Sequence, residues 1–297
     1  MTLDFEPISL ARQEEYHTAL KGCPQLLTSD FSFANIFGWC EHYGLEWAFH
    51  KGICFIRQTK PEITYWAPVG PWADYDWSGC CAMHESARFT RVPEELSKLW
   101  KDAYGDTIIL TENRDHWDYI YSVAELIALK GKKFHKKKNL LNQFKKNYLY
   151  QYEPMGPECV EEVLEMQDEW YKWYEENNPS EALKAENHAI TRVLHNIDQI
   201  KGLMGATLRV KGKVIAYTVA EPLCEDSIVI HFEKGDIRHK GVYQAINQMF
   251  LENGASEYTN VNREQDLGDE GLRKAKLSYN PTFFLKKYEA TLIEPSP

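Results

Sequence analysis

The sequence has no long hydrophobic run and no cysteine spacing that is typical of a disulfide framework or a zinc site. No apolar stretch approaches the roughly 20 residues that a membrane-spanning helix needs. The N-terminus lacks the basic region and apolar stretch of a signal peptide, and the seven scattered cysteines include no C-x-x-C pair. We therefore expect a cytoplasmic protein with no membrane span, no disulfide framework and no zinc site.

Signatures of several large enzyme classes are missing as well. The chain contains no nucleophile elbow, no Walker loop, no dinucleotide fingerprint and no H-E-x-x-H motif. Any catalytic chemistry must therefore be sought in residues that no common short motif marks, and we expect no metal cofactor.

Acidic residues outnumber basic ones, yet one segment is strongly basic. The net charge is −10, while eight lysines and no acid lie between Lys130 and Tyr150. Apolar residues recur there at helical spacing, which predicts an amphipathic helix with lysines on one face. Such a face is either simply solvated or contacts the phosphates of a tRNA, a nucleotide cofactor or a membrane surface. The lysines considered for contact with tRNA are Lys132, Lys133, Lys136, Lys137 and Lys138.

The order of predicted elements is repeated in the two halves of the chain. In the first half, helical segments at residues 10–20 and 33–40 precede a hairpin at 45–57 that turns at Lys51-Gly52. In the second half, the elements are helices at 157–177 and 180–198, a hairpin at 203–221, a strand at 228–233, a helix at 242–251 and strands at 257–261 and 283–290. This repetition predicts an α+β fold of tandem acetyltransferase-like (GNAT-like) domains, each a mixed, mainly antiparallel sheet flanked by helices.

The length of 297 residues suits two domains of about 150 residues each. We expect an N-terminal acetyltransferase-like domain at 1–130, a basic helical connector at 131–150 and a C-terminal acetyltransferase-like domain at 151–297. Only the second half has a basic glycine turn after its strands, so the active site is expected in the C-terminal domain.

This basic turn joins the strand at 228–233 to the helix that follows it. Its residues are Arg238, His239, Lys240, Gly241, Val242 and Tyr243. Backbone N–H groups at such a turn, together with the helix N-terminus, can bind the pyrophosphate of a cofactor such as CoA. Tyr243 stands where acetyltransferases carry a small residue, so the alternatives are a solvated turn or a blocked loop in a protein that has lost catalysis.

Four stretches of the chain resemble a known family. They are the motif R-E-Q-D-L-G-x-x-G-L-R-x-x-K at 263–276 and the segments 33–39, 138–144 and 233–236. The chain resembles a bacterial family of unknown function that is similar to the C-terminal domain of phosphatidylglycerol lysyltransferases. The resemblance implies a tandem acetyltransferase-like fold and an acyl- or aminoacyl-transfer activity, with aminoacyl-tRNA as the donor in lysyltransferase members.

Candidate catalytic residues lie on the strand before the basic turn. Alternation places His231 and Glu233 on the same face of that strand. Acyl transfer to an amine needs a base, and Glu233 is the first choice, with His231 as its partner or as a histidine satisfied by the core. Tyr279 either protonates the leaving group or is simply packed before Pro281.

The family motif supplies candidate substrate-binding residues. They are Asn262, Arg263, Glu264, Asp266, Arg273 and Lys276. So many charges of both signs form either a substrate-recognition loop or an ion-pair network. Arg273 and Lys276 lie three residues apart on a predicted helix, so together they could bind a carboxylate or a phosphate.

Two kinds of function remain open from the sequence. The first is transfer of an acyl group from a CoA thioester or an aminoacyl-tRNA to an amine or hydroxyl of a small-molecule, peptide or lipid acceptor. The alternative is a non-catalytic module that binds RNA or an anionic membrane surface through Lys130–Lys146.

Overall fold

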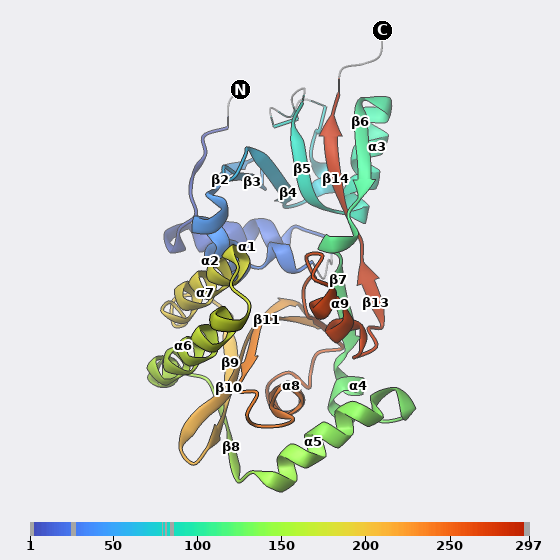
Figure 1. Ribbon diagram of the computed structural model, residues 1–297. Coiled ribbons are helices and arrows are strands. Elements are labelled where there is room, and N and C mark those ends of the chain that lie inside the picture. Colours follow the sequence, from blue (N-terminus) through green and yellow to red (C-terminus); the bar gives the residue numbers. More distant parts are fainter. Residues whose placement is uncertain (1–2, 25–27, 79, 81, 84–85, 294–297) are drawn as a thin grey trace. The chain divides into compact units, whose positions relative to one another are not determined.

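The computed structural model describes residues 3–24, 28–78, 80, 82–83 and 86–293 (Figure 1). The chain forms two compact units that alternate along the sequence. Unit 1 comprises Met1–Asp118, Gln265–Gly268 and Phe284–Pro297, and unit 2 comprises Tyr119–Glu264 and Asp269–Phe283. The division into 1–130, 131–150 and 151–297 stays a prediction.

Unit 1 is built on a sheet with the strand order β1-β2-β3-β4-β5-β14-β6. Its strands are β1 (Glu6–Pro7), β2 (Leu45–His50), β3 (Ile53–Gln58), β4 (Thr64–Val69), β5 (Arg88–Pro93), β6 (Ile108–Glu112) and β14 (Lys287–Leu292). Its α-helices are α1 (Gln13–Lys21), α2 (Phe33–Tyr43) and α3 (Glu94–Tyr104). Neighbouring strands are antiparallel except for β4 and β5.

Local sequence explains several of these boundaries. The Ser32 hydroxyl caps α2 by accepting a hydrogen bond from the Asn35 N–H, and the helix ends at Gly44, whose φ is 58°. The expected hairpin of β2 and β3 turns at Lys51-Gly52, where both residues have positive φ. The helix expected at 10–20 begins as a 3-10 turn and becomes α-helical at Gln13.

A buried charge cluster lies inside unit 1. The Lys287 ammonium binds Asp30 and lies 2.7 Å from Asp118 Oδ1, and Arg91 Nη1 lies 2.7 Å from Asp30 Oδ1. Gln265 donates a hydrogen bond of 2.9 Å to Asp30 Oδ1. Burial raises the pKa of Asp30, but Lys287 and Arg91 outweigh burial and lower that pKa to about 2. Asp30 is therefore ionised at neutral pH, and the cluster joins segments that are far apart in the sequence.

Unit 2 contains most of a second sheet, with the strand order β13-β7-β12-β11-β10-β9-β8. The strands are β7 (Asp118–Ser122), β8 (Tyr150–Pro154), β9 (Met204–Val210), β10 (Lys213–Cys224), β11 (Ser227–Gly235), β12 (Asn260–Asn262) and β13 (Phe283–Leu285). The helices are α4 (Val123–Ala128), α5 (His135–Asn147), α6 (Val160–Asn177), α7 (Glu181–Leu194), α8 (Val242–Gly254) and α9 (Glu270–Leu277). Strands β11 and β12 are parallel, which is where the helix α8 crosses over.

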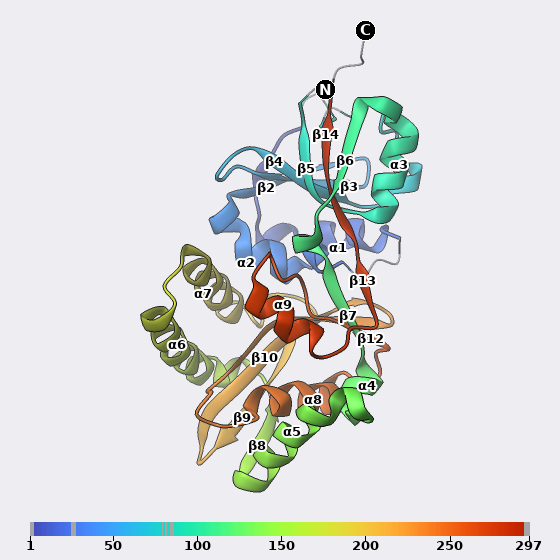
Figure 2. The same ribbon diagram turned by 45° about the vertical axis from the view of Figure 1, so that its right-hand side comes forward.

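Helices cover both faces of this second sheet. Successive residues of β11 point to opposite faces: Glu233 bonds to Asn247 of α8, whereas Lys234 bonds to Glu186 of α7. Helices α4 and α5 pack against α8 on its side of the sheet, as Figure 2 shows. The short 3-10 helices are η1 (Leu10–Arg12), η2 (Ser29–Phe31), η3 (Trp72–Asp74), η4 (Gly105–Thr107), η5 (Arg114–His116), η6 (Lys132–Phe134) and η7 (Pro157–Cys159). None of the helices in the described part of the chain is both long and apolar enough to span a bilayer.

Candidate functional site

Glu233 lies in a buried ion pair on the α8 face of the second sheet. Its Oε1 accepts a hydrogen bond of 2.8 Å from Arg263, which directly follows β12, and its Oε2 accepts one of 2.9 Å from Asn247 of α8. The Glu233 side chain is 7% exposed. Burial lowers the pKa of Arg263, but Glu233, Tyr279 and Tyr121 together outweigh burial and raise that pKa, so Arg263 stays charged. The structure therefore holds the expected base in one fixed orientation.

Tyr279 shares Arg263 with Glu233. The guanidinium carbon of Arg263 lies 5.0 Å from the centre of the Tyr279 ring, and the Tyr279 hydroxyl accepts a hydrogen bond of 2.9 Å from Gln244 of α8. Burial raises the pKa of Tyr279 more strongly than Arg263 lowers it, so the phenol keeps its proton at neutral pH. We name this group of Glu233, Arg263, Tyr279, Gln244 and Asn247 the Glu233 cluster.

Two lysines add positive charge beside the Glu233 cluster. The ammonium of Lys137, from α5, lies 3.9 Å from the centre of the Tyr279 ring, and burial followed by repulsion from Arg263 lowers the pKa of Lys137. The Lys276 ammonium donates a hydrogen bond of 2.7 Å to the backbone carbonyl of Arg263. Arg263 and Lys137 therefore both lie against the Tyr279 ring, and Lys276 holds the Arg263 backbone, an arrangement of positive charge that suits an anionic or carbonyl-bearing substrate.

His231 is held between two other carboxylates. Its Nδ1 lies 2.8 Å from Glu264 Oε1 and its Nε2 lies 3.4 Å from Glu221 Oε1. Burial lowers the pKa of His231, but these two carboxylates together raise it to about 9. An imidazole that already carries both protons cannot accept another. The geometry therefore favours a role for His231 in holding Glu264, with Asn262 Oδ1 fixing the Glu264 backbone N–H at 2.7 Å.

The basic turn is less cationic than its sequence indicates. Arg238 is exposed, and its Nε donates a hydrogen bond of 2.8 Å to Asp236 Oδ1. His239 Nδ1 lies 3.2 Å from Asp236 Oδ2, so the same carboxylate faces two members of the turn. Lys240 is exposed as well. Asp236 thus offsets the positive charge of the turn that would otherwise attract a cofactor pyrophosphate.

Gly241 and its two successors serve helix packing. Gly241 has a φ of 88°, and a Cβ at this position would lie 2.2 Å from the backbone oxygen of Leu140 in α5. Val242 is buried, and the Tyr243 hydroxyl accepts a hydrogen bond of 3.2 Å from Trp170 Nε1. Glycine is therefore required here by the close approach of α5, whether or not the turn also binds a cofactor.

The predicted substrate-binding residues do not all belong to one unit. Asn262, Arg263 and Glu264 belong to unit 2, whereas Asp266 belongs to unit 1. Asp266 is fully buried and lies 3.3 Å from Arg114 Nη1. Asp266 therefore forms an ion pair with Arg114, in line with the ion-pair network that was one of the two alternatives for this motif.

Arg273 and Lys276 lie on α9 as expected, since that helix begins after the Asp269 cap. The Lys276 ammonium points to the Arg263 carbonyl. The Arg273 backbone N–H bonds to Asp269 within the first turn, and its side chain is half-buried. That Arg273 and Lys276 together bind a carboxylate or a phosphate of a substrate stays a prediction.

Sequence reasoning missed three polar members of the site. Gln244 and Asn247 lie three residues apart on α8 and both face the Glu233 cluster, a spacing that was visible in the sequence. Tyr121 of β7 donates a hydrogen bond of 2.9 Å to the Lys276 carbonyl, and no local pattern marks it. Among the described residues, no group of His, Cys, Asp and Glu is arranged to hold a metal ion.

Comparisons with known proteins agree with this architecture. A family model described as "Phosphatidylglycerol lysyltransferase, C-terminal" matches residues 25–291. A conserved protein of unknown function from Bacteroides thetaiotaomicron VPI-5482 is 32% identical and superimposes with a TM-score of 0.86 over 98% of this chain and 100% of that one. L-PGS from Bacillus licheniformis is 15% identical, with a TM-score of 0.66 over 100% of this chain and 95% of that one.

Two further proteins are similar to this chain in sequence or in fold. An uncharacterized protein from Mycoplasmoides gallisepticum is 26% identical over 65% of this chain, and the match spans 61% of that relative's length. FemX is 9% identical with a TM-score of 0.53 over 98% of both chains, and this likeness concerns the fold alone. The expected tandem acetyltransferase-like fold is confirmed. The chain belongs to the family of phosphatidylglycerol lysyltransferase C-terminal domains.

Proposed function

We propose that unit 2 transfers an aminoacyl or acyl group to an amine or hydroxyl, with Glu233 as the base. The observation that carries this proposal is the Glu233 cluster, in which Arg263 contacts both a buried carboxylate and a protonated phenol. Acyl transfer uses a base and an acid, because one proton leaves the nucleophile and another reaches the leaving group. Here Arg263 positions both groups.

In the proposed reaction, the acceptor nitrogen or oxygen attacks the carbonyl carbon of the donor and gives its proton to Glu233. The bond from that carbon to the leaving oxygen or sulfur then breaks, and Tyr279 gives its proton to the leaving atom. Arg263 and Lys137 stabilise the negative charge that develops on the carbonyl oxygen. Solvent exchange afterwards returns a proton to Tyr279 and removes one from Glu233.

For the donor, we propose aminoacyl-tRNA ahead of acyl-CoA. Family membership supports an aminoacyl donor, and the pairing of Arg238 with Asp236 weakens the pyrophosphate interpretation of the turn. The basic segment offers exposed ammonium groups for tRNA phosphates at Lys132, Lys133, Lys136 and Lys138, whereas Lys137 points to Tyr279. For the acceptor, a lipid is the first candidate because relatives carry phosphatidylglycerol in their names.

We also propose a cytoplasmic location for this activity. Described cysteines such as Cys40, Cys54 and Cys159 are free thiols, as is usual in a reducing compartment.

The test is aminoacyl transfer from lysyl-tRNA to phosphatidylglycerol, measured for the wild type and for Glu233→Gln. Loss of the base is expected to lower turnover by about 100-fold or more while donor affinity changes little. The exposed Glu257→Gln supplies the matched control, since it removes the same charge from the same unit. Because Glu233→Gln leaves Arg263 without its carboxylate, Tyr279→Phe provides a second variant that keeps this ion pair. Full turnover in both variants would refute the proposed mechanism.

The second candidate is a non-catalytic module that binds RNA. It is favoured by the seven exposed lysines among the eight between Lys130 and Tyr150. This candidate requires RNA affinity that falls steeply with salt and is the same in Glu233→Gln and in the wild type.

A further inference from the structure

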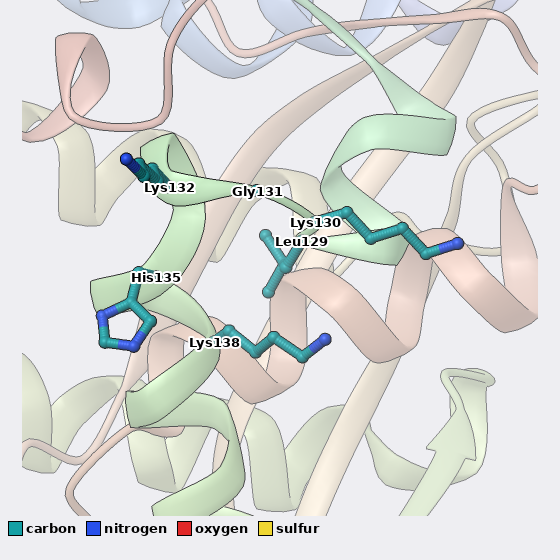
Figure 3. Close-up of a pocket in the computed structure, with 6 residues that line it drawn as sticks. All are labelled: Leu129, Lys130, Gly131, Lys132, His135 and Lys138. Atoms are coloured by element: carbon teal, nitrogen blue, oxygen red, sulfur yellow. The ribbon is translucent and has the colours of Figure 1, made fainter.

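A pocket opens where α4 gives way to α5, and none of the catalytic steps proposed above uses it. Its volume is about 520 Å³. Figure 3 shows the side chains that line it. The lining residues are Leu129, Lys130, Gly131, Lys132, His135 and Lys138. We name it the lysine pocket. None of these residues belongs to the Glu233 cluster.

The lining of the lysine pocket carries charge of one sign. Three of its six residues are lysines and one is histidine, and none is acidic. The neighbouring Lys133 pairs with Glu125, with 2.8 Å between the ammonium and a carboxylate oxygen. In contrast, no carboxylate of the described residues pairs with Lys130, Lys132 or Lys138. Lys133, beside the pocket, is therefore neutralised by Glu125, whereas the lysines that line the pocket can bind an anion from solution.

The backbone of the pocket is open to a ligand as well. Gly131 has a φ of 89°, and the space where a Cβ would project contains no atom within 4 Å. A glycine here leaves its backbone accessible in a conformation that other residues rarely adopt. Helix α5 follows after one 3-10 turn, with no acidic residue in its first turn. These features add to the attraction for an anion that the lysines create.

We propose that the lysine pocket binds a single phosphate group carried by a small molecule or by a lipid headgroup. Its volume lies in the range of pockets that hold small ligands. Figure 3 shows the side chains of Lys130 and Lys138 extending toward the same side, and we expect both ammonium groups to contact one phosphate. Leu129 supplies an apolar contact for the group that bears the phosphate.

The probe is inorganic phosphate, followed by glycerol 3-phosphate, titrated into the full-length protein by NMR with the Gly131 amide as reporter. Saturable shifts at Gly131 are expected in the wild type. The double variant Lys130→Gln/Lys138→Gln is expected to weaken binding by about tenfold or more, because two charge-assisted contacts are lost. Lys146→Gln is the matched control, since it takes a charge from the exposed face of α5 outside the pocket.

The two sources of the phosphate are separated by sedimentation with vesicles of phosphatidylglycerol and phosphatidylcholine in equal parts. Vesicle binding that the double variant loses and Lys146→Gln keeps assigns the pocket to a headgroup. Binding of glycerol 3-phosphate without vesicle binding assigns it to a soluble ester. Equal weakening by Lys146→Gln and the double variant would overturn the proposal, and so would binding of an RNA hairpin together with no Gly131 shift from either phosphate.

Discussion

Replacing Lys287 by methionine is expected to destabilise the protein strongly. The Lys287 side chain is fully buried between Asp30 and Asp118, and methionine keeps its length but removes the charge. Breaking a buried ion pair by removing one partner costs about 3–5 kcal/mol, because the remaining charge has no compensation. For a unit of this size, such a loss lowers the midpoint of thermal unfolding by about 10 °C.

The neighbouring lysine supplies the control. Lys286 is 43% exposed on its side chain and pairs with Glu112 at 3.1 Å. An exposed pair contributes at most about 1 kcal/mol, so Lys286→Met is expected to move the midpoint by only a degree or two. Chemical denaturation of both variants, followed by far-UV circular dichroism, measures the difference in unfolding free energy directly.

The effect of Lys287→Met is also expected to depend on pH. The pKa of Asp30 is lowered to about 2 from its usual value of 3.8, so its ion pairs stabilise the wild type above pH 3.8 and are lost as the pH falls toward 2. The difference between wild type and variant should therefore be largest near neutral pH and shrink on acidification. A difference that stayed constant with pH, or one as small as that of Lys286→Met, would refute an ionised buried cluster.

Two other substitutions test the second unit. The raised pKa of His231 stabilises the fold only while the imidazole is protonated, so the unfolding free energy of the wild type should fall by about 3 kcal/mol as the pH rises from 6.5 through 9. His231→Gln should remove most of this fall. An unchanged pH profile in the variant would contradict the ion pairs with Glu221 and Glu264. Gly241→Ala should lower the unfolding free energy, measured with denaturant, by about 3 kcal/mol, since it combines a positive φ with a clash against Leu140. The control Gly212→Ala has a φ of 79° and open space around the new Cβ, so it should lower the unfolding free energy by only about 1 kcal/mol. Equal losses in the two variants would show that the packing of α5 does not require the glycine.

Sequence reasoning succeeded where the determinants are local. The Lys51-Gly52 turn fixes its hairpin because two adjacent residues with positive φ match the twist of the flanking strands. Likewise, the Glu233 side chain contacts Asn247 of α8 and Arg263, a residue that the family motif had singled out. The turn and the motif each depend on residues that are close together in the chain.

It failed where partners are distant in sequence. The segment 283–290 was expected to be one strand of the C-terminal domain, but the structure divides it into β13, in the second sheet, and β14, in the first. Strand β7 was not expected at all, because it is short and its partner β12 lies about 140 residues away. The hydrogen bond from Gln265 to Asp30 likewise joins residues that are far apart in the chain, so the buried charge cluster was not predictable from local sequence.

The pairing inside the Glu233 cluster escaped prediction for a different reason. Carboxylates and guanidinium groups occur throughout the family motif, and spacing does not say which of them pair. Asp266 and Glu264 both stand near Arg263 in sequence, yet the guanidinium binds Glu233 from another strand. Only the fold, by setting β12 beside β11, decides that choice.

The position of β14 has a consequence for how the protein is made. In the first sheet, β5 and β6 do not pair with each other, and β14 fills the place between them. During translation, β1 to β6 leave the ribosome first and must wait while all of Tyr119–Glu264 is synthesised. Unit 2 therefore has the opportunity to fold first, and an incomplete chain presents an open sheet edge on both β5 and β6 until its last strand arrives.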